Sequence, residues 1–319
     1  MALSTTDLLR RAMPKIAGPG NLKLRLRVWL AALANRRQFS ALAGDPSPSL
    51  QMMARERPAV LAGPLVWPYL CAGWDADERL KRIQAHYRIV DRLGAPFPFS
   101  ADERLVLADL DATYPGLRIV LDQPKWFMRE GGLTLNLFVD DFRAYSLAFS
   151  FSDSADGQET TEQGSGGPES GGQGIDCLIG AIQGRNTDEA ADLYRDLTKA
   201  AHGLRPRDFL IEMCRILCRH WNVRTLLAVR DSERHHRHPF FGGKKIAPQD
   251  YDAIWQDRGG ALAGPHFYHL PIESERRDEN DIKPNKRSLY RRRYKFLDGL
   301  EAEIFQTLPK LAPVRFADR

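Results

Sequence analysis

Residues 133–151 read Leu-Thr-Leu-Asn-Leu-Phe-Val-Asp-Asp-Phe-Arg-Ala-Tyr-Ser-Leu-Ala-Phe-Ser-Phe. Large apolar side chains occupy every second position over residues 133–137 and again over residues 145–151. Such alternation on both sides of a short acidic turn, Asp140-Asp141, predicts two antiparallel strands joined as a hairpin. The fold is therefore expected to contain a mainly antiparallel sheet.

Strand patterns continue on both sides of this hairpin. Residues 117–121 form a short branched apolar run, and residues 177–183 form a fully apolar run that ends at Gly184. Further strands are predicted at residues 225–229 and 267–270, the last of them followed directly by a proline.

Helix signals separate the later strands. Thr187 has the properties of an N-cap, Gly203 those of a C-terminal stop and Pro206 those of a first helical residue, so two consecutive helices are predicted. A further helix is predicted over residues 250–256. This order of elements predicts an α+β fold, with a mainly antiparallel sheet and flanking helices, preceded by a helical N-terminal region.

The N-terminal region differs from the rest of the chain. Residues 1–80 are predicted to be helical and irregular because prolines break their pattern into short pieces, and residues 81–310 are predicted to form the α+β domain. Residues 22–33 contain three basic side chains and therefore cannot span a membrane. We expect them to form a helix packed on its own protein. The alternative is a basic amphipathic helix on a membrane surface.

Residues 153–174 differ in composition from their surroundings. They contain seven glycines and five acids, with no basic residue and no large apolar one. Such a segment cannot bury enough surface to offset its ordering entropy. A disordered insertion between two strands is predicted there.

The overall composition excludes several classes of protein. Of 319 residues, 43% are hydrophobic and 27% are charged, which excludes collagen, coiled coil and disorder of the whole chain. The formal net charge of +5 is modest. Four cysteines are too few for a disulfide framework, and no apolar signal-peptide core follows Arg10 and Arg11. We expect a cytoplasmic protein, with peripheral contact to the inner membrane as a further expectation.

Several short motifs combine into one pattern. Two of them are Ile179-Gly-Ala-Ile-Gln-Gly184 and Leu197-Thr-Lys-Ala-Ala-His-Gly-Leu-Arg-Pro-Arg207. The others are His86-Tyr87-Arg88, Arg129-Glu130-Gly131, Leu133-Thr-Leu-Asn136, Tyr251-Asp252 with Trp255, Gly259-Gly260, and Lys286-Arg-Ser-Leu-Tyr-Arg-Arg-Arg-Tyr294. With these motifs, most of the chain resembles the VirK/YbjX-like family of Gram-negative bacterial proteins.

This resemblance implies an association with virulence and with display or maintenance of the cell surface, but it names no reaction. Two segments depart from the family pattern. One is the insertion at residues 153–174, and the other is Arg234-His-His-Arg-His238. The closely spaced histidines of the second segment are expected to be solvated.

The order of strands and helices also looks like the core of a GNAT-type acyltransferase. In that fold, amides at a helix N-terminus hold the pyrophosphate of coenzyme A. Gly203, Arg205 and Arg207 are therefore predicted to bind acyl-CoA. His202, near Lys199, is the predicted general base for acyl transfer to an amine or hydroxyl. The alternative is that this loop only joins two helices, with His202 placed favourably at the end of the first one.

Residues 286–295 contain six basic side chains and two tyrosines. The predicted anion- or partner-binding residues are Lys199, Lys286, Arg287, Arg291, Arg292 and Arg293. Such a patch can bind an anionic ligand or a membrane surface, whereas nucleic acid is disfavoured because no nucleic-acid-binding fold accompanies it. The alternative is a solvated helix whose arginines pair with acids such as Asp278, Glu279 and Asp281.

No metal site is predicted. Cys214 and Cys218 share one helix face, but no second pair with zinc-finger spacing exists, so both are expected to be core thiols.

Two classes of function remain open. One is an acyltransferase that acts on a cell-envelope or protein acceptor. The other is a non-enzymatic accessory factor that supports the expression or surface localisation of outer-membrane or virulence proteins, through contact with an envelope protein.

Overall fold

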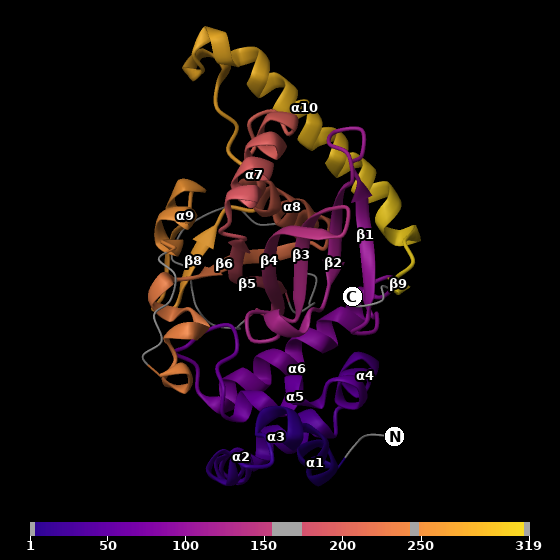
Figure 1. Ribbon diagram of the computed structural model, residues 1–319, viewed down its shortest axis with the longest axis vertical. Helices are drawn as coiled ribbons and strands as arrows, with labels where there is room; N and C mark the ends of the chain where they lie inside the picture. The colour runs from indigo at the N-terminus through magenta and orange to yellow at the C-terminus, as the bar shows by residue number, and fades with distance from the viewer. Residues whose placement is uncertain (1–3, 155–173, 243–248, 316–319) are drawn as a thin grey trace.

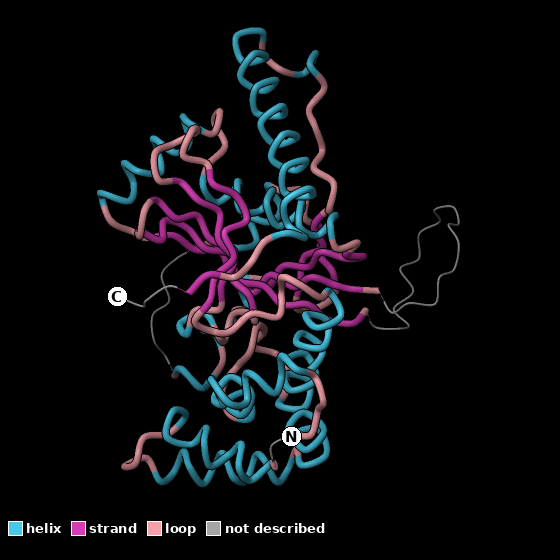
Figure 2. Tube along the Cα trace, turned by 90° about the vertical axis from the view of Figure 1, so that its right-hand side faces the viewer, coloured by secondary structure: helices cyan, strands magenta, loops and turns pink. Residues whose placement is uncertain are grey.

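The computed structural model describes residues 4–154, 174–242 and 249–315. The strands form one layer across the middle of the molecule, and helices lie on both sides of that layer (Figure 1, Figure 2). The N-terminal helices lie at one end of the long axis, and the start of helix α10 (Pro284–Thr307) lies at the other end (Figure 1).

Nine strands of the described chain form one sheet, in the order β7-β8-β6-β5-β4-β3-β2-β1-β9. Its middle strands are β1 (Glu103–Asp109), β2 (Leu117–Asp122), β3 (Leu133–Val139), β4 (Phe142–Asp153) and β5 (Ile175–Gly184). Its outer strands are β6 (Val223–Val229), β7 (Ala261–Ala263), β8 (Phe267–Leu270) and β9 (Val314–Arg315). Among the described strands only β5 and β6 pair in parallel, which confirms the prediction of an α+β fold with a mainly antiparallel sheet.

The hairpin predicted from residues 133–151 is formed by β3 and β4. The turn lies at Asp140-Asp141, where Asp140 has a φ of +51°, a conformation that aspartate tolerates better than most residues. The polar side chains of β3, Thr134 and Asn136, are buried as well as the apolar ones. Helices on both sides of the sheet explain this burial, because neither face of the hairpin is left to solvent.

The N-terminal part of the described chain contains six helices. They are α1 (Thr5–Ile16), α2 (Leu22–Ala34), α3 (Arg36–Ala43), α4 (Pro48–Glu56), α5 (Pro58–Ala62) and α6 (Ala76–Leu93). Several begin at a side chain that accepts a backbone N–H, as Ser4, Asn21, Ser47 and Asp75 do. Helix α6 packs directly on β4 and so joins this helical layer to the sheet.

The later helices include the predicted pair. They are α7 (Asp188–Ala200), α8 (Pro206–His220), α9 (Tyr251–Asp257) and α10. Thr187 caps α7 by accepting the Ala190 N–H at 3.3 Å, and Pro206 is the first residue of α8. Helix α8 packs on β3 and β4, and Phe296 of α10 packs on Phe209 of α8. Because α8 lies between the sheet and α10, it is buried nearly all round.

Helix α2 meets the expectation of a helix packed on its own protein on one narrow face only. Val28 and Ala32 are its buried residues, while leucines on another face are exposed. Of the predicted disordered insertion, residues 155–173 lie outside the described residues. Within the described chain, no helix combines the length and the apolar character needed to cross a membrane.

Candidate functional site

Strand β5 is longer than its parallel neighbour β6 and extends past the point where β6 ends. β5 pairs with β6 from Ile175 to Ile179, and its last five residues, Gly180 to Gly184, extend beyond this pairing. A backbone strand without a partner leaves polar groups that must be satisfied in some other way. We call the region beside these five residues, on the side where β6 has ended, the β5–β6 opening.

A tyrosine side chain fills part of the β5–β6 opening. The Tyr251 hydroxyl accepts a hydrogen bond from the Ile182 N–H and donates one to the Ile182 carbonyl, both at 3.0 Å. Tyr251 is the first residue of α9, which Asp250 caps by accepting the Ala253 N–H. One turn later, the Trp255 indole donates to the carbonyl of the last β6 residue, at 2.8 Å. Helix α9 thus binds both strands at the point where β6 ends and β5 continues.

Glu130 lies against the same part of β5. A Cβ on Gly180 would lie 1.9 Å from the Glu130 carbonyl oxygen, so glycine is required for this close approach. The Glu130 carboxyl is buried, and its Oε2 accepts a hydrogen bond from Gln183 Nε2 at 3.2 Å. Its Oε1 lies 3.4 Å from Nε2 of His235, which is also buried.

Burial shifts the pKa values of this pair in opposite directions. It raises the pKa of Glu130 to about 8, an effect that the charges of Arg234 and Arg129 reduce. It lowers the pKa of His235 to about 2, with the charges of His236, Arg129 and Arg234 acting in the same direction. Both shifts describe a neutral pair below pH 8, in which a protonated Glu130 faces an uncharged His235.

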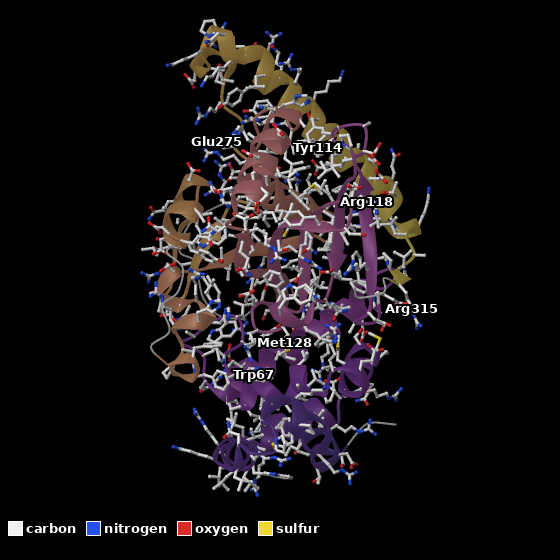
Figure 3. All side chains as sticks on the ribbon, in the orientation of Figure 1. Trp67, Tyr114, Arg118, Met128, Glu275 and Arg315 are labelled. Atoms are coloured by element: carbon white, nitrogen blue, oxygen red, sulfur yellow. The ribbon has the colours of Figure 1, made fainter. Side chains whose placement is uncertain are left out.

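Two arginines surround the pair and are held on aromatic rings. The Arg129 guanidinium lies 4.6 Å from the ring centroid of Trp67, which is labelled in Figure 3, and 5.4 Å from that of Phe241. The Arg234 guanidinium lies 4.1 Å from the ring centroid of Tyr251. Such contacts hold cations in place with few hydrogen bonds. They leave positive charge beside the β5–β6 opening.

The expectation that the closely spaced histidines are solvated is wrong for His235. It is 5% exposed, and its ring centroid lies 3.6 Å from that of the half-buried His236. Sequence reasoning assigned no role to Glu130, although the motif Arg129-Glu130-Gly131 was singled out. The signal available was an acid followed by two glycines ahead of an apolar strand, a composition that allows close approach of neighbouring backbone.

The predicted catalytic and cofactor-binding residues lie in and around the α7–α8 loop. His202 and Gly203 both have positive φ, +53° and +78°, and the His202 carbonyl accepts from Arg293 Nε at 3.1 Å. Arg205 is exposed at the start of α8. Arg207 pairs with Asp208 at 2.9 Å. The structure therefore brings His202, Gly203 and Arg293 together, with the two other arginines at the first turn of α8.

This loop is packed against α10. A Cβ on Gly203 would lie 2.7 Å from the Arg293 guanidinium, and the His202 ring meets the Phe296 ring edge-on at 5.8 Å. Lys199, at the end of α7, pairs with Asp196 at 3.1 Å. A second set of ion pairs lies at the start of α8, where Arg207 approaches an Asp257 oxygen at 3.7 Å. Acids therefore neutralise part of the charge predicted to bind an anion.

The basic patch predicted at residues 286–295 lies in the first half of α10. Arg291 pairs with Glu279 at 3.1 Å, as the solvated-helix alternative predicted. Arg287 Nε donates to the Ile282 carbonyl. The Arg293 guanidinium lies 4.7 Å from the Tyr290 ring centroid. Within the described chain, the exposed Lys286, Arg292 and Lys295 form no ion pair, so they are the charges of this patch most open to a ligand.

Three groups of side chains offer metal-ligand atoms within 4.8 Å of one another in the described chain. In the first, Glu130, His235 and His236, the neighbouring Arg129 and Arg234 disfavour a further cation. The second, Cys177, Cys214 and Cys218, consists of buried free thiols in the core, where reduced cysteine packs as a small apolar side chain.

The third group is Cys71, Glu233 and His266. The Cys71 thiol donates to Glu233 Oε2 at 3.5 Å, and His266 Nδ1 lies 3.0 Å from the same oxygen. A Cβ on Gly73 would lie 2.6 Å from that oxygen, so a glycine keeps the space between the three side chains. Thiolate, imidazole and carboxylate are the ligands of zinc, and this set could hold such an ion. The sequence separation of 162 residues between Cys71 and Glu233 explains why no motif indicated it.

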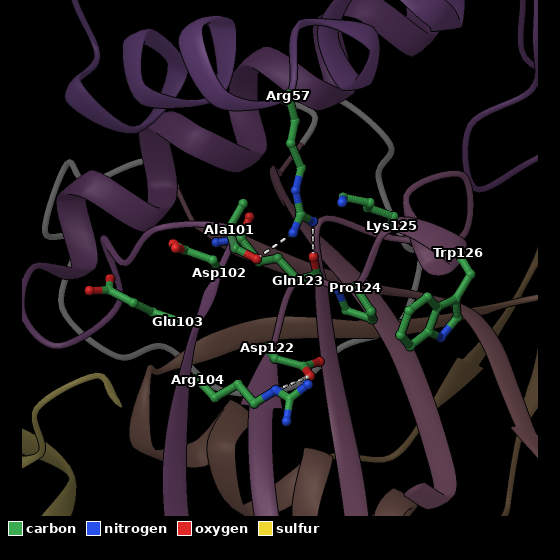
Figure 4. A pocket seen from close by; sticks show the side chains of 10 residues that line it. All are labelled: Arg57, Ala101, Asp102, Glu103, Arg104, Asp122, Gln123, Pro124, Lys125 and Trp126. Atoms are coloured by element: carbon green, nitrogen blue, oxygen red, sulfur yellow. Dashed lines mark hydrogen bonds and ion pairs between the residues drawn. The ribbon is translucent and has the colours of Figure 1, made fainter. Parts of the chain in front are cut away.

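A small pocket lies toward the other edge of the sheet, between β1, β2 and the end of α4 (Figure 4). It encloses about 30 Å³, and Arg57 donates to the carbonyls of Ala101 and Gln123 at its wall. Arg104 pairs there with Asp122 at 3.3 Å. This volume holds about two or three water molecules, so the pocket is too small for an acyl chain.

Comparisons with known proteins place this chain in a family. The model of a family described as "Protein of unknown function (DUF535)" matches residues 18–165 and 168–306. Two Haemophilus influenzae proteins, both described as uncharacterized, are 32% identical over 129 residues and 34% identical over 131 residues. These matches cover 40% and 41% of this chain and 43% of each relative.

A third relative is the Escherichia coli K12 protein described as "Uncharacterized protein YbjX". It is 29% identical over 128 residues, which is 40% of this chain and 39% of the relative. The chain thus spans less than half the length of these curated relatives. No solved structure matches it. Because the family model covers most of the chain, the protein belongs to the DUF535 family, the VirK/YbjX family of Gram-negative bacteria.

Proposed function

We propose that this protein transfers an acyl group from a coenzyme A thioester to an acceptor of the cell envelope or to a protein, and that the β5–β6 opening is the reaction site. The observation that carries the proposal is that β5 extends past the end of its parallel neighbour β6, directly beside a buried carboxyl group whose pKa is raised to about 8. This topology supports the resemblance to a GNAT-type core that was inferred from the order of elements.

The start of α8 supplies the region that would hold the anionic part of the donor. Tyr145 pairs with Gly184 at the end of β5, and the charges of Arg207 and Asp208 act on the Tyr145 hydroxyl. The first turn of α8 therefore lies near the β5–β6 opening. Phosphate binding at this turn is favoured by the helix dipole and by the charges of Arg205 and Arg207. The negative charge of Asp208 disfavours it.

The reaction includes two proton transfers, one from the acceptor and one to the leaving thiolate. As the acceptor oxygen or nitrogen attacks the thioester carbon, its proton leaves, the C–S bond breaks, and the thiolate of coenzyme A takes up a proton. A group with a pKa near the working pH performs such transfers best. Glu130, with a pKa of about 8, has this property, and His235 holds its carboxyl in place. Glu130 is therefore our first candidate for the general base.

His202 is the alternative base, carried over from the sequence prediction. It lies against Phe296 on the α10 side of the α7–α8 loop. The two candidates are separated by comparing His202→Ala with Glu130→Gln in an assay of free thiol release from acyl-CoA. Loss of a general base lowers turnover about 10²- to 10⁴-fold. The variant that shows this loss while it still binds acyl-CoA identifies the base.

Isothermal titration with acetyl-CoA and with a long-chain acyl-CoA tests the proposal. We expect saturable binding to the wild-type protein and at least ~10-fold weaker binding to Arg207→Ala, because a charge-assisted contact to phosphate is removed. Arg195→Ala is the matched control, since Arg195 is an exposed arginine of α7 paired with Asp192. A protein that binds neither thioester, or an Arg195→Ala variant as weak as Arg207→Ala, would contradict the proposal.

One observation favours the second candidate function, a non-enzymatic accessory factor. Tyr251 occupies part of the β5–β6 opening and already satisfies both backbone groups of Ile182. If Tyr251 permanently fills this region, no acyl-CoA molecule binds there. The protein would then act without catalysis, by binding an envelope protein. If Tyr251→Phe gains no acyl-CoA binding and the wild-type protein shows none, the accessory role is the better account.

A further inference from the structure

Helix α2 presents a stripe of large apolar side chains to solvent. The exposed fractions are 72% for Leu22, 60% for Leu26, 41% for Trp29, 57% for Leu30 and 65% for Leu33. A single exposed leucine is ordinary, whereas five large apolar residues on one helix form a patch of the kind that marks a binding surface. The function proposed above makes no use of this patch.

The five side chains share one face of the helix. Successive residues of an α-helix are about 100° apart, so these positions fall within an arc of about 100°. The buried residues, Val28 and Ala32, lie on a different face, where α2 packs on the rest of the protein. The exposed apolar arc therefore points away from the molecule and is not the face that α2 uses for folding.

Basic side chains border this arc on both sides. At the same angular spacing, Arg25 lies beside one edge, and Lys23 and Arg27 lie beyond the other. The surrounding sequence contains eight basic residues and no acid between Asp7 and Asp45. The acid at the start of this segment, Asp7, is already paired with Arg10 at 2.9 Å. The basic residues that border the arc therefore have no acid within α2 or next to it in the sequence.

We propose that α2 docks this protein on a membrane surface that contains anionic phospholipid, with its apolar arc inserted at the boundary between headgroups and acyl chains. An apolar face with tryptophan, bordered by lysine and arginine, is the pattern that binds such an interface in the plane of the membrane. The basic residues that border the arc select an anionic surface over a neutral one. An acidic protein partner would match the charge, but the exposed arc of α2 is the convex surface of a single helix.

The position of α2 allows this docking. Helix α2 lies at the end of the molecule farthest from the start of α10 (Figure 1). A flat membrane that contacts α2 therefore cannot also contact the basic patch of α10, and the two surfaces serve different partners. The sheet and the β5–β6 opening remain free in the docked protein, so the inference does not depend on the proposed acyl transfer.

Vesicle flotation with the full-length protein tests the inference. We expect the wild-type protein to float with vesicles of phosphatidylglycerol and phosphatidylethanolamine at low salt, and to stay behind with vesicles of phosphatidylcholine. Removing a buried leucine from the interface weakens partitioning about tenfold, so Leu26→Asp with Leu30→Asp is expected to lose about 100-fold. The matched control is Leu262→Asp on β7, since Leu262 is 62% exposed and lies outside the patch. Circular dichroism confirms that each variant is folded.

Further readouts make the inference falsifiable. Insertion predicts that brominated lipid quenches tryptophan fluorescence in the wild-type protein and that Trp29→Phe removes most of this quenching. Three results would overturn the inference. One is no flotation with anionic vesicles at low salt. Another is equal loss in the Leu262 variant. The third is a dimer in the absence of lipid that the Leu26/Leu30 variant converts to monomer, because a second copy then covers the arc.

Discussion

Replacing Glu130 with glutamine removes a titrating group from the interior while keeping the shape of the side chain. The pKa of Glu130 is about 8 in the folded protein and 4.5 in the absence of structure. Between these values the folded protein holds a proton that the unfolded chain has released. The free energy of unfolding therefore falls as the pH rises, and this residue contributes a loss of about 5 kcal/mol over the whole interval.

The histidines beside Glu130 act in the opposite direction at lower pH. The pKa values of His235 and His236 are lowered to about 2 and about 4 in the folded protein. As the pH falls, these histidines therefore take up protons in the unfolded chain before they do so in the folded protein. Their effect is that the free energy of unfolding increases as the pH rises toward 6.5. Above pH 6.5 each histidine adds only about 0.4 kcal/mol more, because at that pH it is half protonated in the unfolded chain. From pH 6.5 to 8 Glu130 alone among the three lowers stability, by about 2 kcal/mol.

Urea denaturation at pH 6.5 and at pH 8 measures this effect. We expect the wild-type protein to lose about 2 kcal/mol more than Glu130→Gln over this interval. Glu303→Gln is the matched control, because Glu303 is exposed on α10 and makes the same chemical change at the surface. The reasoning is refuted if Glu130→Gln keeps the wild-type pH dependence, or if Glu303→Gln flattens it equally.

Three further substitutions test the same account by urea denaturation at neutral pH. Tyr251→Phe leaves both backbone groups of Ile182 without a partner and is expected to cost about 1–3 kcal/mol; a cost near zero would mean that water replaces the hydroxyl. Gly180→Ala forces a Cβ against the Glu130 carbonyl and is expected to cost about 1–3 kcal/mol or more. Its control is Gly299→Ala in α10, where the added Cβ meets no atom within 4 Å and is expected to stabilise the protein. Equal effects of the two substitutions on the free energy of unfolding would contradict the close approach of Gly180 to Glu130. Asp122→Ala removes the carboxylate that pairs with Arg143 at 2.6 Å and is expected to cost about 3–5 kcal/mol. A loss below about 1 kcal/mol would show that this ion pair is solvated.

Elements with strong local signals were predictable from the sequence. The alternation over residues 133–151, the Thr187 cap and Pro206 each fix a structure through local backbone preferences, and the structure has the hairpin and both helices at those positions. Strands β1, β7 and β9 were missed. β7 and β9 have only three and two residues, and such short strands exist because a neighbouring strand supplies their hydrogen bonds.

The candidate site was predictable only in part. Its residues come from separate elements, and Glu130 meets His235 across more than a hundred positions of sequence. Local patterns carry no information about such a contact, and a histidine cluster therefore reads as a solvated loop. For residues 22–33 the sequence left two alternatives open, a helix packed on its own protein and a helix on a membrane surface, for a related reason. An amphipathic sequence predicts that a helix has an apolar face, but it does not predict whether other parts of the protein cover that face.

The central claim is that the β5–β6 opening accepts an acyl-CoA molecule, and native mass spectrometry of the full-length protein tests it most directly. At saturating acetyl-CoA or long-chain acyl-CoA, the account predicts a complex with one thioester per chain, reduced in Arg207→Ala and unchanged in Arg195→Ala. A protein that carries no thioester under these conditions, alongside an intact folded mass, would contradict the account.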